Sequence, residues 1–284
     1  MISDEHTFQV AAGNGQTLIG LQWKIARPRA VVAIAHGINE HVGRYDRVAE
    51  TLNRAGYSVV GADHRGHGRS APASKRTSNI SRFDDHVDDY IAVIEKVRAE
   101  HTEPVIVLGH SMGGLIAARA ALRIQDRLAA LVLSGPALKI PTGLSPLQLK
   151  LSLMVARLVP FLNAPSGALK ELSRDPSVRQ RMTEDELAIN APLKLGIVRQ
   201  LVILSGDTQA RASELHLPML VMHGAADEIT DPTGSAEFVR NAKSPDKEFV
   251  SWPGDFHEIF NELDRDAVLA KLVGWLEARF PATV

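Results

Sequence analysis

The sequence has 284 residues, a formal net charge of −1 and no cysteine. This length suits one large domain, or one domain that carries an insertion. The balance of 32 Lys and Arg against 33 Asp and Glu argues against a nucleic-acid-binding protein. The absence of cysteine excludes disulfides, thiol catalysis and zinc–thiolate sites. The amino terminus has no apolar signal segment and no apolar run reaches about 18 residues, so we expect a cytoplasmic protein.

The chain begins with two extended segments, Thr7–Ala12 and Gln16–Ile25, which a Gly-Asn-Gly turn joins into a hairpin. Short apolar runs rich in β-branched residues then alternate with helical patterns. We expect buried strands at 31–36, 57–63, 105–110, 129–135, 218–224 and 247–254, and helices near 44–55, 84–100, 113–125, 233–242 and 264–280. This order predicts an α/β fold, a mostly parallel sheet with helices on both faces.

Residues 136–212 break this alternation, because they hold several helix-like segments and no convincing core strand. We therefore expect residues 1–135 and 213–284 to form the α/β core. Residues 136–212 would form a helical cap over the carboxyl edge of the sheet, where ligands bind in such folds.

Within this cap, Ser145–Asn163 predicts a lid helix that is apolar on nearly all sides. Ser145 and Gln148 form a capping-box pattern, and Pro146 falls at the first helical position. One expected face carries Leu147, Leu151, Met154, Val155, Leu158 and Leu162, while Leu149, Leu153 and Val159 extend apolar surface to other sides. Two interpretations stay open: an ordinary buried helix, or a lid with one face over an acyl pocket and another on micelles or membranes.

The segment Gly109-His110-Ser111-Met112-Gly113 matches G-x-S-x-G between a buried strand and a helix, which indicates a nucleophilic serine. A serine on so sharp a turn takes strained backbone angles, and glycines without a Cβ let strand and helix approach. The alternative is a glycine-rich turn with an incidental serine. The expected oxyanion-hole donors are the backbone N–H groups of Met112 and of Ile38, which follows the first parallel strand.

A serine nucleophile needs a histidine base and an acid that orients it, and in this fold the acid and then the histidine follow the serine. Of the later histidines, His223 lies inside a strand and His216 in a loop. His257, which follows a strand and precedes a helix, is therefore the expected base. Asp227 comes directly after a strand and is the expected acid, whereas Asp231 looks like the N-cap of the next helix.

Two other polar clusters have structural interpretations. Residues 63–68, Asp-His-Arg-Gly-His-Gly, resemble a metal-binding tract, but no carboxylate cluster supports one, and a turn that braces the nucleophile loop is favoured. The second cluster, Asp84, Asp85, Asp88 and Asp89, suits a solvated face near a helix start. We expect neither a metal nor a cofactor.

Taken together, the motifs HGINEHVGRY, ADHRGHGRS, GHSMGG, HGAADEITD and WPGDFHEIFNE resemble the monoacylglycerol lipase family of α/β-hydrolases in order and spacing. The resemblance runs from about residue 31 to residue 280, and SRDP at 173–176 also fits it. It implies an α/β-hydrolase fold with Ser111, Asp227 and His257 as the triad. It also implies that Glu40 and Arg44 line the polar end of the substrate site.

Two positions depart from the family pattern. Asn39 stands where many members have glycine, although asparagine tolerates left-handed backbone angles better than most residues. Phe260 stands three residues after His257, where mammalian members have a second histidine. The second departure weakens a strict monoacylglycerol assignment more than it weakens the hydrolase assignment.

The leading hypothesis is a serine ester hydrolase for monoacyl esters, with monoacylglycerol the first candidate. Lysophospholipase, general carboxylesterase and acyl-thioesterase activities would use the same residues, and only the pocket under the cap separates them. A non-catalytic ligand-binding protein on the same scaffold is the remaining alternative. The expected partners are a small-molecule acyl ester and, through the cap, a membrane or micelle surface. The sequence does not predict the oligomeric state.

Overall fold

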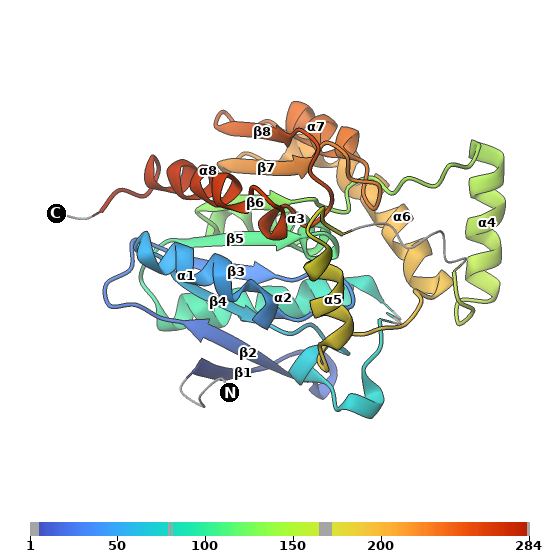
Figure 1. The fold of residues 1–284 in the computed structure, drawn as a ribbon, viewed down its shortest axis with the longest axis horizontal. Coiled ribbons are helices and arrows are strands. Elements are labelled where there is room, and N and C mark those ends of the chain that lie inside the picture. The colour runs from blue at the N-terminus through green and yellow to red at the C-terminus, as the bar shows by residue number, and fades with distance from the viewer. Residues whose placement is uncertain (1–5, 79, 81, 165–171, 283–284) are drawn as a thin grey trace.

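Unbroken apolar runs form the centre of a single eight-stranded sheet with the order β1-β2-β4-β3-β5-β6-β7-β8 (Figure 1). The computed structural model describes residues 6–78, 80, 82–164 and 172–282. The strands are β1 (Thr7–Ala11), β2 (Thr17–Trp23), β3 (Val31–Ala35), β4 (Ser58–Ala62), β5 (Val105–His110), β6 (Ala130–Ser134), β7 (Met219–Gly224) and β8 (Lys247–Trp252). Strand β2 pairs antiparallel with β1 and β4, and every other pairing is parallel. The predicted α/β-hydrolase fold is confirmed.

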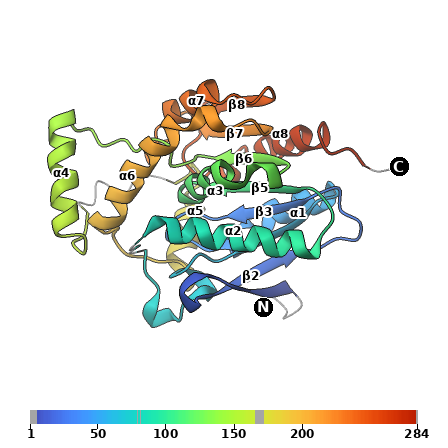
Figure 2. The ribbon, with the colours of Figure 1, turned by 180° about the vertical axis from the view of Figure 1, so that it is seen from behind.

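Helices cover both faces of the sheet and divide the apolar core in two. On one face lie α1 (Asp46–Arg54) and α8 (Arg265–Glu277), whose leucines and valines pack on β3, β5 and β7. On the other face lie α2 (Phe83–Glu100), α3 (Met112–Ile124) and α7 (Pro232–Asn241) (Figure 2). Burial on both faces explains why the central strands show no polar alternation.

The segment 136–212, which we call the cap, leaves the carboxyl end of β6 and contains α4 (Pro146–Leu158), α5 (Pro176–Glu184) and α6 (Leu195–Ala210). In the described part of the cap, the only β pairing is an isolated bridge between Asn163 and Lys194. Helix α6 packs on α3 and α7, and α4 packs on α6. Figure 1 accordingly shows α4 at the far edge of the molecule, with α6 between it and the sheet. Among the described residues, no helix is long and apolar enough to cross a membrane.

Helix α4 has the predicted capping box, since the Ser145 and Gln148 side chains each bond the other residue's backbone N–H. The interpretation as an ordinary buried helix is wrong, because Ala156 is its only buried residue. The exposed face carries Leu147, Leu151, Met154, Val155 and Leu158, which are 52% to 73% exposed. Leu149 and Leu153, expected to extend the apolar surface to other sides, are half-buried, and their spacing places them on the inner face with Ala156.

The Asp-His-Arg-Gly-His-Gly segment is a structural turn, but it braces a different loop from the one expected. Fully buried Asp63 accepts hydrogen bonds from the backbone N–H of Val42 at 2.8 Å and of Arg69 at 2.7 Å. His64 donates its backbone N–H to Nε2 of His36 at 2.8 Å. The turn therefore holds the loop after β3, which carries Ile38, rather than the nucleophile loop.

The acidic face of α2 is only partly solvated. Asp89 is 1% exposed and forms two hydrogen bonds of 2.6 Å with the guanidinium of Arg65. Asp84 and Asp88 do lie at the surface, paired with arginines of α3. The expectation of a uniformly solvated face was wrong for Asp89, because Arg65 reaches it from the turn after β4.

Four buried histidines, His36, His64, His67 and His86, form a cluster under the loop after β3, with neighbouring ring centroids 4.0 to 6.5 Å apart. Burial and, for most of them, the nearby imidazoles lower the pKa of all four below the usual value. A histidine with a lowered folded-state pKa takes up a proton on unfolding once the pH falls below about 6.5. The stability it contributes is therefore present above that pH and is lost as the pH falls.

We accordingly predict that the free energy of unfolding decreases steeply with acidification below about pH 6.5. In His86→Leu, which keeps an apolar contact with Phe83, the slope should be shallower by up to about 1.4 kcal/mol per pH unit. Urea unfolding measured from pH 8 to pH 5 tests this, with the exposed His216→Leu as control. Equal slopes in wild type and His86→Leu would contradict it.

Candidate active site

The backbone of Ser111 lies in a strained turn between β5 and α3, with φ +54° and ψ −121°. A Cβ atom on Gly109 would collide with the carbonyl of Gly113, and one on Gly113 would collide with the carbonyls of Ala35 and His36. Both glycines of the motif are thus required by close backbone approach, as the sequence predicted. The alternative of an incidental serine does not account for this strain.

The loop after β3, residues 37–41, lies against the serine, and we call it the oxyanion loop. A Cβ on Gly37 would come within 3.3 Å of Cβ of Ser111. Asn39 has φ +65°, so this departure from glycine is met by the residue type that best tolerates left-handed angles. Met112 is the first residue of α3, where a backbone N–H has no acceptor within the helix. Ile38 lies in this loop and Met112 at the start of α3, and their role as oxyanion-hole donors stays a prediction.

Glu40 and Arg44 are joined to each other rather than left free. The buried carboxylate of Glu40 accepts hydrogen bonds from the backbone N–H of Gly37, from Tyr45 Oη at 2.8 Å and from Arg44 at 2.6 Å. Arg44 also binds both carboxylate oxygens of Glu258, at 3.1 and 2.8 Å. A pocket of about 20 Å³ borders these side chains, a volume that admits about one water molecule.

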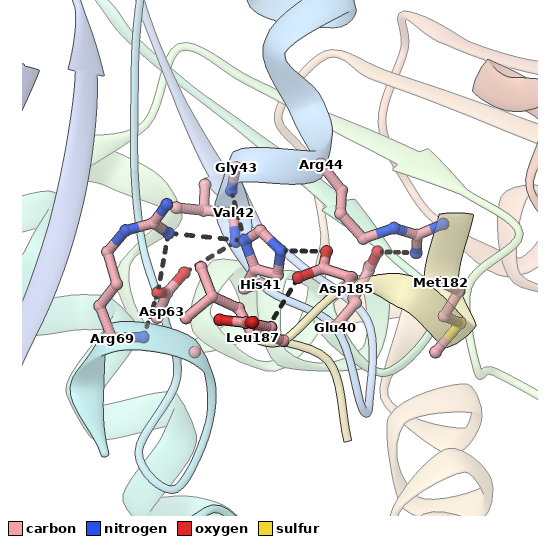
Figure 3. A network of polar contacts seen from close by, with 12 residues as sticks. Glu40, His41, Val42, Gly43, Arg44, Asp63, Arg69, Met182, Asp185 and Leu187 are labelled. Atoms are coloured by element: carbon pink, nitrogen blue, oxygen red, sulfur yellow. Dashed lines mark hydrogen bonds and ion pairs between the residues drawn. The ribbon is translucent and has the colours of Figure 1, made fainter. Parts of the chain in front are cut away.

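The cap holds the oxyanion loop from outside (Figure 3). His41 Nε2 lies 2.7 Å from Oδ2 of Asp185. The same ring accepts the backbone N–H of Gly43 at Nδ1, so Nε2 carries the proton and donates to the carboxylate. The backbone N–H of Ile189 donates to the carbonyl of Asn39 at 2.8 Å. The residues just after α5 thereby fix the loop that carries Ile38.

Asp227 and His257 form a buried acid–base pair. Oδ2 of Asp227 lies 2.7 Å from Nδ1 of His257. Oδ1 of Asp227 accepts the backbone N–H groups of Ile229 at 2.7 Å and Thr230 at 3.0 Å, which fixes the carboxylate in the loop after β7. The backbone N–H of Ser111 donates to the carbonyl of Ser134, and a Cβ on the next residue, Gly135, would lie 3.3 Å from Nδ1 of His257. Ser111 therefore lies at the same edge of the sheet as the Asp227–His257 pair.

The prediction that His223 lies inside a strand is confirmed, but the sequence did not predict the partner of its side chain. Its Nε2 lies 3.0 Å from Oδ2 of Asp227, and its Nδ1 lies 2.7 Å from Oγ of Ser235. Thr230 Oγ1 donates to the same carboxylate oxygen at 2.9 Å. Asp227 is therefore held from several sides. The available signal was the spacing of His223 at a strand end, four residues before Asp227.

These contacts shift the pKa of each member of the pair. Burial alone would raise the pKa of Asp227, but the charge of His257 and hydrogen bonds from His223 and His257 outweigh it and hold that pKa well below its usual range. Burial would lower the pKa of His257, and the charge and hydrogen bond of Asp227 reverse this and raise it. The neighbouring His110 has its pKa lowered to about 4, first by burial and then by the charge of His257.

The alternative acid, Asp231, is occupied elsewhere. It caps α7 by accepting the backbone N–H of Thr233 at 2.9 Å, and it pairs with Lys139 at 2.8 Å. Its predicted role as an N-cap is confirmed. His216 lies exposed beside Glu214.

Comparison with known proteins agrees with this geometry. Residues 26–264 match the family described as serine aminopeptidase, S33. The chain belongs to this family. It is 35% identical over 273 residues to a monoacylglycerol lipase of Mycolicibacterium smegmatis, covering 96% of both chains.

Two other relatives show the range of the family. A phospholipase of Bacillus subtilis is 30% identical over 248 residues, which cover 87% of this chain and 94% of that protein. The crystal structure of Paleococcus ferrophilus monoacylglycerol lipase has a TM-score of 0.80 at 29% identity, covering 92% of this chain and 99% of that one. The family member described here is therefore a serine hydrolase that cleaves carboxylic esters.

We predict that Asp227→Asn lowers kcat by about 10⁴-fold, because an amide cannot stabilise the imidazolium and favours the wrong tautomer. Asp231→Asn should cost less than about tenfold, because asparagine is also a good N-cap. Both are measured as kcat on a soluble ester, with circular dichroism as a check on folding. A greater loss in Asp231→Asn would reverse the assignment.

Proposed function

We propose that the protein hydrolyses monoacylglycerols by acyl transfer through Ser111, His257 and Asp227. The observation that carries the proposal is the strained serine turn at the same sheet edge as a buried imidazole–carboxylate pair. Nδ1 of His257 is engaged by Asp227, so Nε2 is the nitrogen that takes the serine proton. A histidine with a raised pKa is a stronger base, and Asp227, held ionised, stabilises the imidazolium that forms.

The reaction has two steps in this proposal. Ser111 attacks the ester carbonyl while His257 accepts its proton, and the oxyanion is stabilised by the N–H groups of Ile38 and Met112. His257 then protonates the leaving alcohol. In the second step, His257 deprotonates a water molecule that attacks the acyl-enzyme, and it then returns the proton to the Ser111 oxygen as the carboxylic acid leaves. All of these groups belong to the chain itself, apart from the water.

Glu40 and Arg44 support this chemistry indirectly in our proposal. The Glu40 carboxylate fixes Gly37, and Gly37 precedes Ile38, so the pair presets the geometry of the oxyanion loop. Contact with the polar end of the substrate, which the family resemblance implies, would occur at the small pocket that both residues border.

Monoacylglycerol is proposed as the substrate because relatives that match nearly the full chain carry that name. The exposed apolar face of α4 supports a substrate that is aggregated in micelles or membranes. No acidic residue lies between 136 and 164, and Lys150 and Arg157 of α4 are exposed, which favours an anionic surface. We therefore propose that α4 touches such a surface without crossing it.

We predict that Ser111→Ala abolishes ester hydrolysis and labelling by a fluorophosphonate probe, because only the nucleophilic oxygen is lost. The residual rate should be lower by at least about 10³-fold. A panel that varies acyl length and leaving alcohol separately then distinguishes monoacylglycerols from lysophospholipids and simple esters. Turnover by the variant within about tenfold of wild type would refute the assignment.

For α4, we predict that Leu151→Ser with Leu158→Ser lowers turnover of a micellar long-chain monoacylglycerol by about tenfold or more. Each leucine that becomes buried in the micelle should contribute about 1.5–3 kcal/mol to the free energy of binding to it. A soluble short-chain ester should be hydrolysed at nearly the wild-type rate. The matched control is Leu149→Ser with Leu153→Ser on the inner face, which should lower the melting temperature and both activities. If the outer pair loses both activities equally, α4 has no surface role.

A further inference from the structure

One arginine of the cap contacts three carboxylates next to the proposed base. Arg174 donates from Nε to Glu262 at 3.0 Å, and its Nη2 bonds Asp255 and also Asp264, the latter at 2.9 Å. The three carboxylates lie within 4.8 Å of one another. They belong to residues 255–264, which we call the base loop because it contains His257. Among the described residues, no other cationic side chain bonds to these carboxylates.

Backbone contacts extend this attachment along the base loop. The carbonyl of Leu172 accepts the backbone N–H of Glu258 at 2.7 Å, and Ser173 Oγ donates to the carbonyl of Asn261 at 3.1 Å. Oε1 of Glu262 accepts the backbone N–H of both Arg174, at 3.1 Å, and Phe256, at 2.8 Å. Three consecutive cap residues thus hold the segment on both sides of His257.

The base loop is also tied to the loop that carries the proposed acid. The carbonyl of Asp255 accepts the backbone N–H of Ala226 at 2.9 Å, and Ala226 directly precedes Asp227. A displacement of Asp255 would therefore change the separation of His257 and Asp227. A shift of about 1 Å in such a pair can cost about 10²-fold in rate.

The charge balance of this group depends on Arg174. The Asp255 and Glu262 side chains are fully buried, whereas Asp264 is 47% exposed. Burial first, and then the negative charges of Asp264 and Glu262, raise the pKa of Asp255 to about 7, and Arg174 opposes that rise. One of the Asp255 oxygens, Oδ2, is buried with no hydrogen-bond partner among the described residues.

We propose that Arg174 is a positioning residue, whose positive charge offsets part of the repulsion among the three carboxylates and so keeps the base loop in register with Asp227. The inference rests on the proposed role of His257. It assigns a catalytic consequence to the SRDP segment of the cap, 173–176, which is separate in sequence from the cap residues that contact the oxyanion loop, Asp185 and Ile189.

The proposal predicts a particular pH dependence when the guanidinium is removed. Without Arg174, the pKa of Asp255 rises further, and at low pH its proton relieves the repulsion from Glu262 and Asp264. At high pH all three groups are charged and repel one another, which displaces the base loop. The ratio of variant to wild-type activity should therefore fall as the pH rises, whereas a loss of packing alone would lower it equally at every pH.

We would measure kcat and KM of Arg174→Gln on a soluble short-chain ester from pH 6 to pH 9.5. The expected ratio to wild type is within about fivefold at pH 6 and falls by a further tenfold or so at pH 9, in kcat more than in KM. The high-pH activity of Arg174→Lys should lie between those of wild type and Arg174→Gln. A lysine ammonium keeps the positive charge but lacks the planar guanidinium that bonds several carboxylates at once. The matched control is Arg181→Gln, a surface arginine of α5 whose hydrogen bond among the described residues is to Ser177.

A double variant completes the test. Adding Asp264→Asn to Arg174→Gln removes the exposed carboxylate and should restore most of the high-pH activity. Asp264→Asn alone is measured as well, which completes the double-mutant cycle. A ratio that does not change with pH, or no recovery in the double variant, would overturn the proposal. If wild type itself fails to hydrolyse esters and to react with the fluorophosphonate probe, the proposed function fails instead.

Discussion

The position of Ser111 depends on a close approach of backbones that only glycine allows. With φ +54°, the turn places the serine at the end of β5 and starts α3 at the next residue. That geometry requires Gly109 and Gly113, because either Cβ would collide with a carbonyl. The strain is maintained because β5 and α3 are both buried in the apolar core, whose packing free energy far exceeds the few kcal/mol such a conformation costs.

Around this turn, the site contains buried charged side chains, and each is compensated by several hydrogen-bond partners. Asp227 is held by His257, His223 and Thr230, and Glu40 is held by Gly37, Tyr45 and Arg44. A buried carboxylate with a full set of donors stays ionised and keeps one orientation. The same contacts that satisfy these charges therefore also fix the orientation of the groups that we propose as catalytic, so that less reorganisation is needed when the substrate binds.

The sequence predicted the elements and the residues that depend on local pattern, and it failed where a contact joins distant segments. Strand β5 and its serine turn follow from an unbroken apolar run with flanking glycines, and Asp227 follows from its place after β7. Arg174 had no predicted role, because its carboxylate partners lie 81 to 90 residues further along the chain. Asp89 was expected at the solvated face of its helix for a similar reason, because its partner Arg65 lies in another segment of the chain. For α4 the sequence left burial and exposure open, because a helix that is apolar on nearly every side does not show which face is covered.

The cap therefore has two parts with different physical roles. Its inner part, the residues around α5, bonds the oxyanion loop through Asp185 and Ile189 and the base loop through Leu172, Ser173 and Arg174. Its outer part, α4, packs on α6 and presents an apolar face to solvent. Because the inner part positions groups that act on every substrate, changes there should affect all esters. Because α4 has no described hydrogen bond to the two loops, substitutions on its exposed face should affect only substrates presented at a surface. The cap thus couples catalytic geometry and substrate presentation through one chain segment while leaving them separable by mutation.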